Sequence, residues 1–114
     1  RGKDDAVTAP LIPPAAESAL AAAGVSLKWN ASGPPTTWFA TATLGPVGCF
    51  RAQREGYGPT LRVATIAAVG SLRSRLVAES ARVGAAGDVQ WRDLYAADAE
   101  KMRALAEALR ETWT

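Results

Sequence analysis

The spacing of apolar residues changes near Thr60, from alternation to a period of three or four. Between residues 25 and 55, apolar and polar residues alternate in short runs, a pattern typical of half-buried β-strands. After Thr60 the apolar residues fall on one side of a helix. They are Val63, Ile66, Val69, Leu72 and Leu76. The pattern predicts a sheet followed by a helix.

Three strands are predicted, at residues 25–29, 36–44 and 49–55. The segments between them, residues 30–35 and 45–48, contain the Gly and Pro residues that favour turns. Connections this short suit antiparallel neighbours. We therefore expect an antiparallel meander.

Helices are predicted on both sides of the strands. Residues 14–23 are rich in Ala, begin at a Pro and end before Gly24. A second helix is expected over residues 60–82, with Thr60 as its N-cap. Gly70 lies inside it and costs about 1 kcal/mol relative to Ala, so we expect Gly70 to mark a close approach to the sheet.

The order of elements predicts an α+β fold, α-β-β-β-α with a three-stranded antiparallel sheet and an added C-terminal helix. Residues 1–12 are predicted to be a mobile arm. Residues 13–83 would form the α-β-β-β-α domain. Residues 84–114 would form a hinge and the last helix, expected over residues 89–113.

Composition narrows the chemistry of this chain of 114 residues. Cys49 is the single cysteine and there is no His, which excludes an intrachain disulfide, a Cys/His zinc site and an imidazole base. We expect no enzyme activity and no cofactor. A lone cysteine suits a reducing compartment, so we expect a cytoplasmic protein. No apolar run is long enough to span a membrane, so we expect no membrane partner.

The net charge of +2 is unevenly distributed. Residues 49–84 carry six Arg against Glu55 and Glu79. Arg suits phosphate contacts because its planar guanidinium donates paired hydrogen bonds. The alternative is a solvated surface without a ligand. The candidate phosphate-binding residues are Arg51, Arg54, Arg62, Arg73 and Arg75.

Two segments give the chain a family resemblance. Gly33-Pro34-Pro35 lies between the first two strands, and a longer stretch opens the second helix. That stretch is Gly56-Tyr57-Gly58-Pro59-Thr60-Leu61-Arg62-Val63-Ala64-Thr65-Ile66-Ala67-Ala68. Together with the order of elements, these segments resemble the double-stranded RNA-binding domain over about residues 13–76. A β-β-β-α sheet of the HicB antitoxin type has similar turn residues between its elements and is a second candidate relative.

The resemblance implies binding of duplex RNA. The N-terminus of the second helix would contact phosphates, while the first helix and first hairpin loop would reach minor grooves. Leu61, Arg62 and Thr65 stand where that family has three Lys residues, so one cation of three remains.

The last helix carries an apolar stripe that a lone helix cannot keep from water. It packs either on the same domain or on a partner, and we expect a homo-oligomer or a protein partner. The candidate contact residues are Trp91, Met102, Leu105, Leu109 and Trp113.

The sequence therefore predicts a small nucleic-acid-binding or nucleoprotein-associated module with backbone contacts through Arg. The alternative is a protein–protein assembly module, an oligomer subunit or virion-type structural component, without nucleic-acid binding. Arg side chains that share one exposed face would favour nucleic acid. Arg side chains that pair with Glu55, Glu79 and the acids of the last helix would favour assembly.

Overall fold

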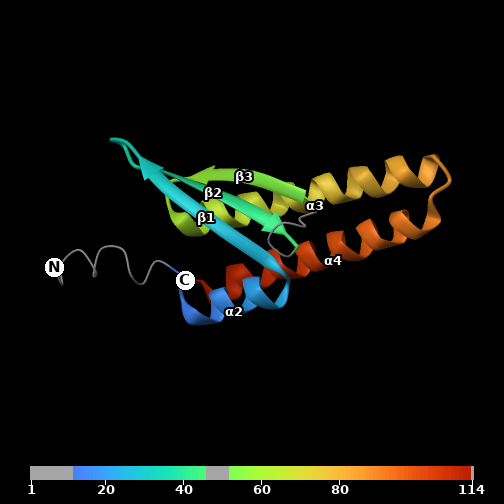
Figure 1. Cartoon of the computed structure of the whole chain (residues 1–114). Helices are drawn as coiled ribbons and strands as arrows, with labels where there is room; N and C mark the ends of the chain where they lie inside the picture. Colours follow the sequence, from blue (N-terminus) through green and yellow to red (C-terminus); the bar gives the residue numbers. More distant parts are fainter. Residues whose placement is uncertain (1–11, 46–51, 114) are drawn as a thin grey trace.

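The computed structural model describes residues 12–45 and 52–113, and it confirms the predicted α+β class (Figure 1). Most of the predicted arm at residues 1–12, and Cys49, therefore lie outside the described residues. The elements are α2 (Pro14–Ala22), β1 (Val25–Ser32), β2 (Thr37–Leu44), β3 (Ala52–Gly58), α3 (Leu61–Ala85) and α4 (Val89–Thr112).

The three strands form an antiparallel sheet in the order β1-β2-β3. Strand β1 is longer than predicted, because Asn30 pairs with Phe39 and Ser32 pairs with Thr37. The turn is thereby confined to residues 33–36. Pairing along the whole hairpin outweighs the weak strand propensity of Asn and Ser.

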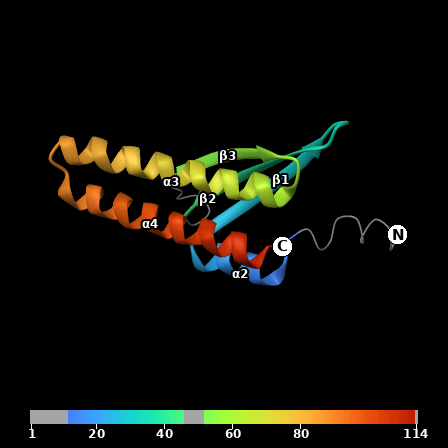
Figure 2. The same cartoon turned by 180° about the vertical axis from the view of Figure 1, so that it is seen from behind.

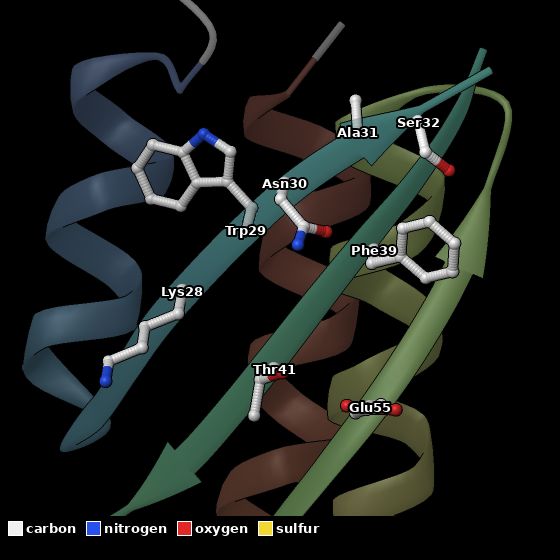
Figure 3. A pocket seen from close by; sticks show the side chains of 8 residues that line it. All are labelled: Lys28, Trp29, Asn30, Ala31, Ser32, Phe39, Thr41 and Glu55. Atoms are coloured by element: carbon white, nitrogen blue, oxygen red, sulfur yellow. The ribbon is translucent and has the colours of Figure 1, made fainter. Parts of the chain in front are cut away.

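All three helices lie on one face of the sheet (Figures 1 and 3). Helix α3 packs across β2 and β3, and α2 packs against β1. Helix α4 packs along α3 and also against α2, and Figure 3 shows it between these two helices. Seen from behind in Figure 2, α3 and α4 run side by side beyond the end of the sheet. Among residues 12–45 and 52–113, no helix lies on the opposite face of the sheet.

The contact between α3 and the sheet is closest at Gly56. A Cβ atom there would lie 2.3 Å from the carbonyl oxygen of Ala64 and 2.3 Å from the backbone nitrogen of Ala68. No side chain fits in that space. Gly70, which was expected to mark the close approach, has nothing within 4 Å of its would-be Cβ. That expectation is wrong. The glycine at the close approach is Gly56 on the strand, where the lack of a side chain lets the helix come near.

Helix α4 supplies part of the core. Met102 and Leu109 are fully buried, and Leu105 and Trp113 are nearly so. The segment expected to be a hinge is a tight turn, in which the Asp88 amide donates to the Val83 carbonyl at 2.9 Å and Gly87 adopts a φ of 89°. Of the two alternatives for the apolar stripe of α4, the structure has the packing on the same domain, where α4 contacts both α2 and α3.

The two Gly positions predict opposite stability changes. Gly56→Ala should lower the free energy of unfolding by several kcal/mol, because backbone atoms of α3 would have to move. Gly70→Ala should raise it by about 1 kcal/mol, because Ala favours a helix and meets no neighbour. Chemical denaturation of both variants measures the difference. A tolerated Gly56→Ala would contradict the close approach.

A second pair tests the role of α4. Leu109→Ala should cost about 2–5 kcal/mol because it opens a cavity in the core. Leu94→Ala, on the same helix but 39% exposed, should cost less than about 1 kcal/mol. Equal effects in urea denaturation would show that α4 does not belong to the core.

Candidate binding face of the sheet

The side of the sheet turned away from the helices forms a polar surface that we call the open face. Ala40, Ala42 and Leu44 of β2 are buried against the helices, so the alternate residues point the other way. Cross-strand pairing extends this assignment to β1 and β3. The open face consists of Ser26, Lys28, Asn30, Ser32, Thr37, Phe39, Thr41, Thr43, Gln53, Glu55 and Tyr57.

An aromatic pair occupies one row of the open face. Asn30, Phe39 and Tyr57 are paired across the three strands. The rings of Phe39 and Tyr57 meet edge to face, with centroids 5.3 Å apart. This geometry is a favourable one for aromatic rings. Tyr57 is 57% exposed and Phe39 is half-buried, so the row combines a partly covered ring with an accessible one.

The neighbouring row carries the charges of the open face. Lys28, Thr41 and Glu55 are paired across β1, β2 and β3. The Tyr57 hydroxyl donates to Glu55 Oε1 at 3.2 Å, which ties the two rows together. Lys28 makes no hydrogen bond or ion pair with the residues that the structure describes.

A shallow hollow of about 570 Å³ lies over these rows (Figure 3). Its lining comes mainly from β1, with Trp29 at the strand edge, on the side of α2. The remaining lining residues are Lys28, Asn30, Ala31, Ser32, Phe39, Thr41 and Glu55. Hydroxyl, amide and aromatic groups with one cation and one anion suit contact with a polar, uncharged surface.

Arg62 has an intrachain role. Its Nε donates to the Trp113 carbonyl and its Nη2 donates to the Arg110 carbonyl at 3.3 Å. The guanidinium therefore caps the C-terminal end of α4, where carbonyl groups are unpaired and the helix dipole favours a cation. Leu61 and Thr65 are buried. All three positions at which the family resemblance implies phosphate contacts serve the protein's own packing.

Among the described residues, the other candidate arginines, Arg54, Arg73 and Arg75, do not all share one face. Arg73 and Arg75 are two residues apart in α3, so they point about 160° apart. Arg75 pairs with Glu79 at 3.4 Å. Arg54 lies on β3, in register with Ala42 of the helix-covered side, although it is itself exposed. Arg51 lies outside the described residues.

Two further arginines, Arg82 on α3 and Arg103 on α4, form ion pairs with glutamates of their own helices. Arg82 pairs with Glu79 at 2.7 Å, and the hydrogen bond from Arg82 is the main cause of the lowered pKa of Glu79. The pKa of Glu100 is lowered chiefly by its hydrogen bond from Arg103, and the charge of Arg73 adds to that. The positive charge of α3 is thus partly balanced by acids on α3 and α4.

The expected partner residues of α4 fall into two groups. Met102, Leu105, Leu109 and Trp113 lie in the core rather than on a surface that a partner could contact. Trp91 is 43% exposed and packs on Tyr95, with ring centroids 5.5 Å apart. Other exposed apolar residues of α3 and α4 are Val77, Val89 and Leu94.

Comparison with known proteins gives no relative. No family model, no curated protein and no solved structure matches the chain. The resemblance to the double-stranded RNA-binding domain therefore stays a prediction from the sequence. No helix among residues 12–45 and 52–113 is long and apolar enough to cross a membrane.

The capping role of Arg62 predicts a stability effect. Arg62→Gln should lower the free energy of unfolding by about 1–2 kcal/mol, because two carbonyl groups at the end of α4 lose a charged donor. Arg73→Gln is the matched control on α3, since Arg73 is exposed and no hydrogen bond of its side chain occurs among the described residues. Thermal unfolding of both measures the difference. An equal loss would rule out the cap.

Proposed function

We propose that the protein is a non-enzymatic assembly module that associates with further copies of itself through the open face of its sheet. The observation that carries the proposal is the open face itself, which extends over three strands and presents an aromatic pair among hydroxyl and amide groups. Such a surface provides both stacking area and hydrogen-bonding groups for a protein partner.

Charge supports self-association over nucleic-acid binding. Affinity for nucleic acid comes largely from phosphate contacts, which require accessible cations. The open face has one Lys and one Glu, so it offers no excess of positive charge. The guanidinium of Arg62 donates a hydrogen bond to the Trp113 carbonyl at the end of α4, and that of Arg75 forms an ion pair with Glu79. A neutral surface does not repel a second copy of itself.

The dimensions of the open face set the strength of the contact. Three strands of seven or eight residues give a face of roughly 26 Å by 14 Å. The resulting area of about 360 Å² per copy is smaller than that of standard specific interfaces, which bury roughly 600–1,000 Å² on each partner. We therefore expect weak, reversible association.

Phe39 provides the test of this proposal. Sedimentation velocity over a wide concentration range should show reversible association of the full chain. Phe39→Thr should weaken it at least fivefold, because the central ring is lost while Thr keeps the strand propensity. Trp91→Gln is the matched control, since Trp91 is an exposed aromatic residue on α4, away from the open face. It should leave association unchanged.

Three results would overturn the proposal. The first is a chain that stays monomeric at millimolar concentration. The second is association that Trp91→Gln abolishes and Phe39→Thr does not, which would assign the contact to the helical hairpin. The third is salt-dependent binding of duplex RNA, duplex DNA or a single strand by a monomeric chain, which would restore the nucleic-acid interpretation.

A further inference from the structure

We infer that two copies of the chain stack their open faces about a twofold axis parallel to β2, so that Lys28 of each copy meets Glu55 of the other. This inference rests on the proposed self-association and specifies its geometry. It follows from the position of the two charges in the sheet.

Lys28 and Glu55 lie at opposite ends of one cross-strand row. Lys28 pairs with Thr41 from β1, and Glu55 pairs with Thr41 from β3. The two backbone positions are therefore two strand spacings apart, about 10 Å. No ion pair between the two side chains occurs in the described part of the chain. Both side chains are exposed (Figure 3).

A twofold axis along β2 makes this row complementary to itself. Such a rotation places β1 of one copy over β3 of the other. Each cross-strand row of one copy then lies opposite the equivalent row of the other copy. Lys28 then faces Glu55 twice in each dimer, and Phe39 lies over Phe39. Stacked sheets are about 10 Å apart, a gap that a Lys and a Glu side chain can bridge from opposite sides.

Other twofold arrangements do not give this match. An axis across the strands, through the same row, would place Lys28 over Lys28 and Glu55 over Glu55. Like charges opposite each other are unfavourable. The row of charges thus selects one axis, and the symmetric contact that results closes after two copies. Because α2, α3 and α4 lie on the other face, these helices do not obstruct the stacking (Figure 3).

Charge reversal tests the axis directly. Lys28→Glu and Glu55→Lys should each raise the dissociation constant of the dimer about tenfold, because two attractive contacts become repulsive. The double variant should return to the wild-type value, since its charges are exchanged and still complementary. A mixture of the two single variants should associate more tightly than either alone, because both contacts in the mixed dimer are attractive.

Arg54→Glu is the matched control. It changes the net charge as much as Lys28→Glu does, and it is exposed on β3 next to Glu55 but in register with the opposite side of the sheet. It should leave the dissociation constant unchanged at physiological salt. Thermal unfolding of every variant confirms that the fold is intact.

The outcomes separate the geometry from the proposed function. Single variants that dimerise like the wild type, with Phe39→Thr still weakening association, would overturn the twofold axis and leave self-assembly through the open face in place. A double variant as weak as the single ones would also overturn the axis. A wild-type chain that never associates would overturn both.

Discussion

The placement of the helices on one face of the sheet depends on the close packing of α3 against β3. At Gly56 the strand backbone approaches the helix so closely that a Cβ atom would lie 2.3 Å from the Ala64 carbonyl oxygen and the Ala68 nitrogen. Ala64 and Ala68 are themselves fully buried and small. The contact fixes where α3 crosses the sheet, and α3 in turn provides the surface along which α4 packs. Because α2 and α4 lie on the same side of the sheet as α3, none of the described helices covers the other side.

Helix α4 completes the core, and its C-terminal carbonyl groups bind the guanidinium of Arg62, a residue that the sequence predicts as a phosphate contact. Its C-terminal end lies next to the first turn of α3, where Arg62 donates to the carbonyl groups of Arg110 and Trp113. The positive end of one helix thereby meets the negative end of the other, an arrangement that the helix dipoles favour. The Arg that most resembles a phosphate ligand is thus explained by the packing of the last two helices.

The sequence predicted the order of helices and strands well and the open face only in part. Alternation and the change of period near Thr60 were sufficient to place three strands and the long helix, and the hydroxyl of Thr60 does accept from the Val63 amide. Periodicity also showed that one side of α4 must be buried. It could not show which elements α4 packs against, because α2 and α3 lie far apart in the sequence. The open face was visible in part, since Thr41 and Thr43 alternate with Ala40 and Ala42. Its charged row required the strand register, which joins residues 28 and 55 through Thr41.

Charges at Lys28 and Glu55 also have a simpler explanation, since β1 and β3 are edge strands and charged side chains discourage edge-to-edge pairing. The two explanations differ in what they require of the sign. Protection of an edge needs a charge of either sign, so reversing one residue preserves it. Complementarity between two open faces needs opposite signs on the two edges, so reversing one residue destroys it and reversing both restores it. An antiparallel sheet with one solvated face is common. The distinctive property of this face is the opposite sign of the charges on its two edges, and in the proposed dimer that placement makes the face complementary to a copy of itself.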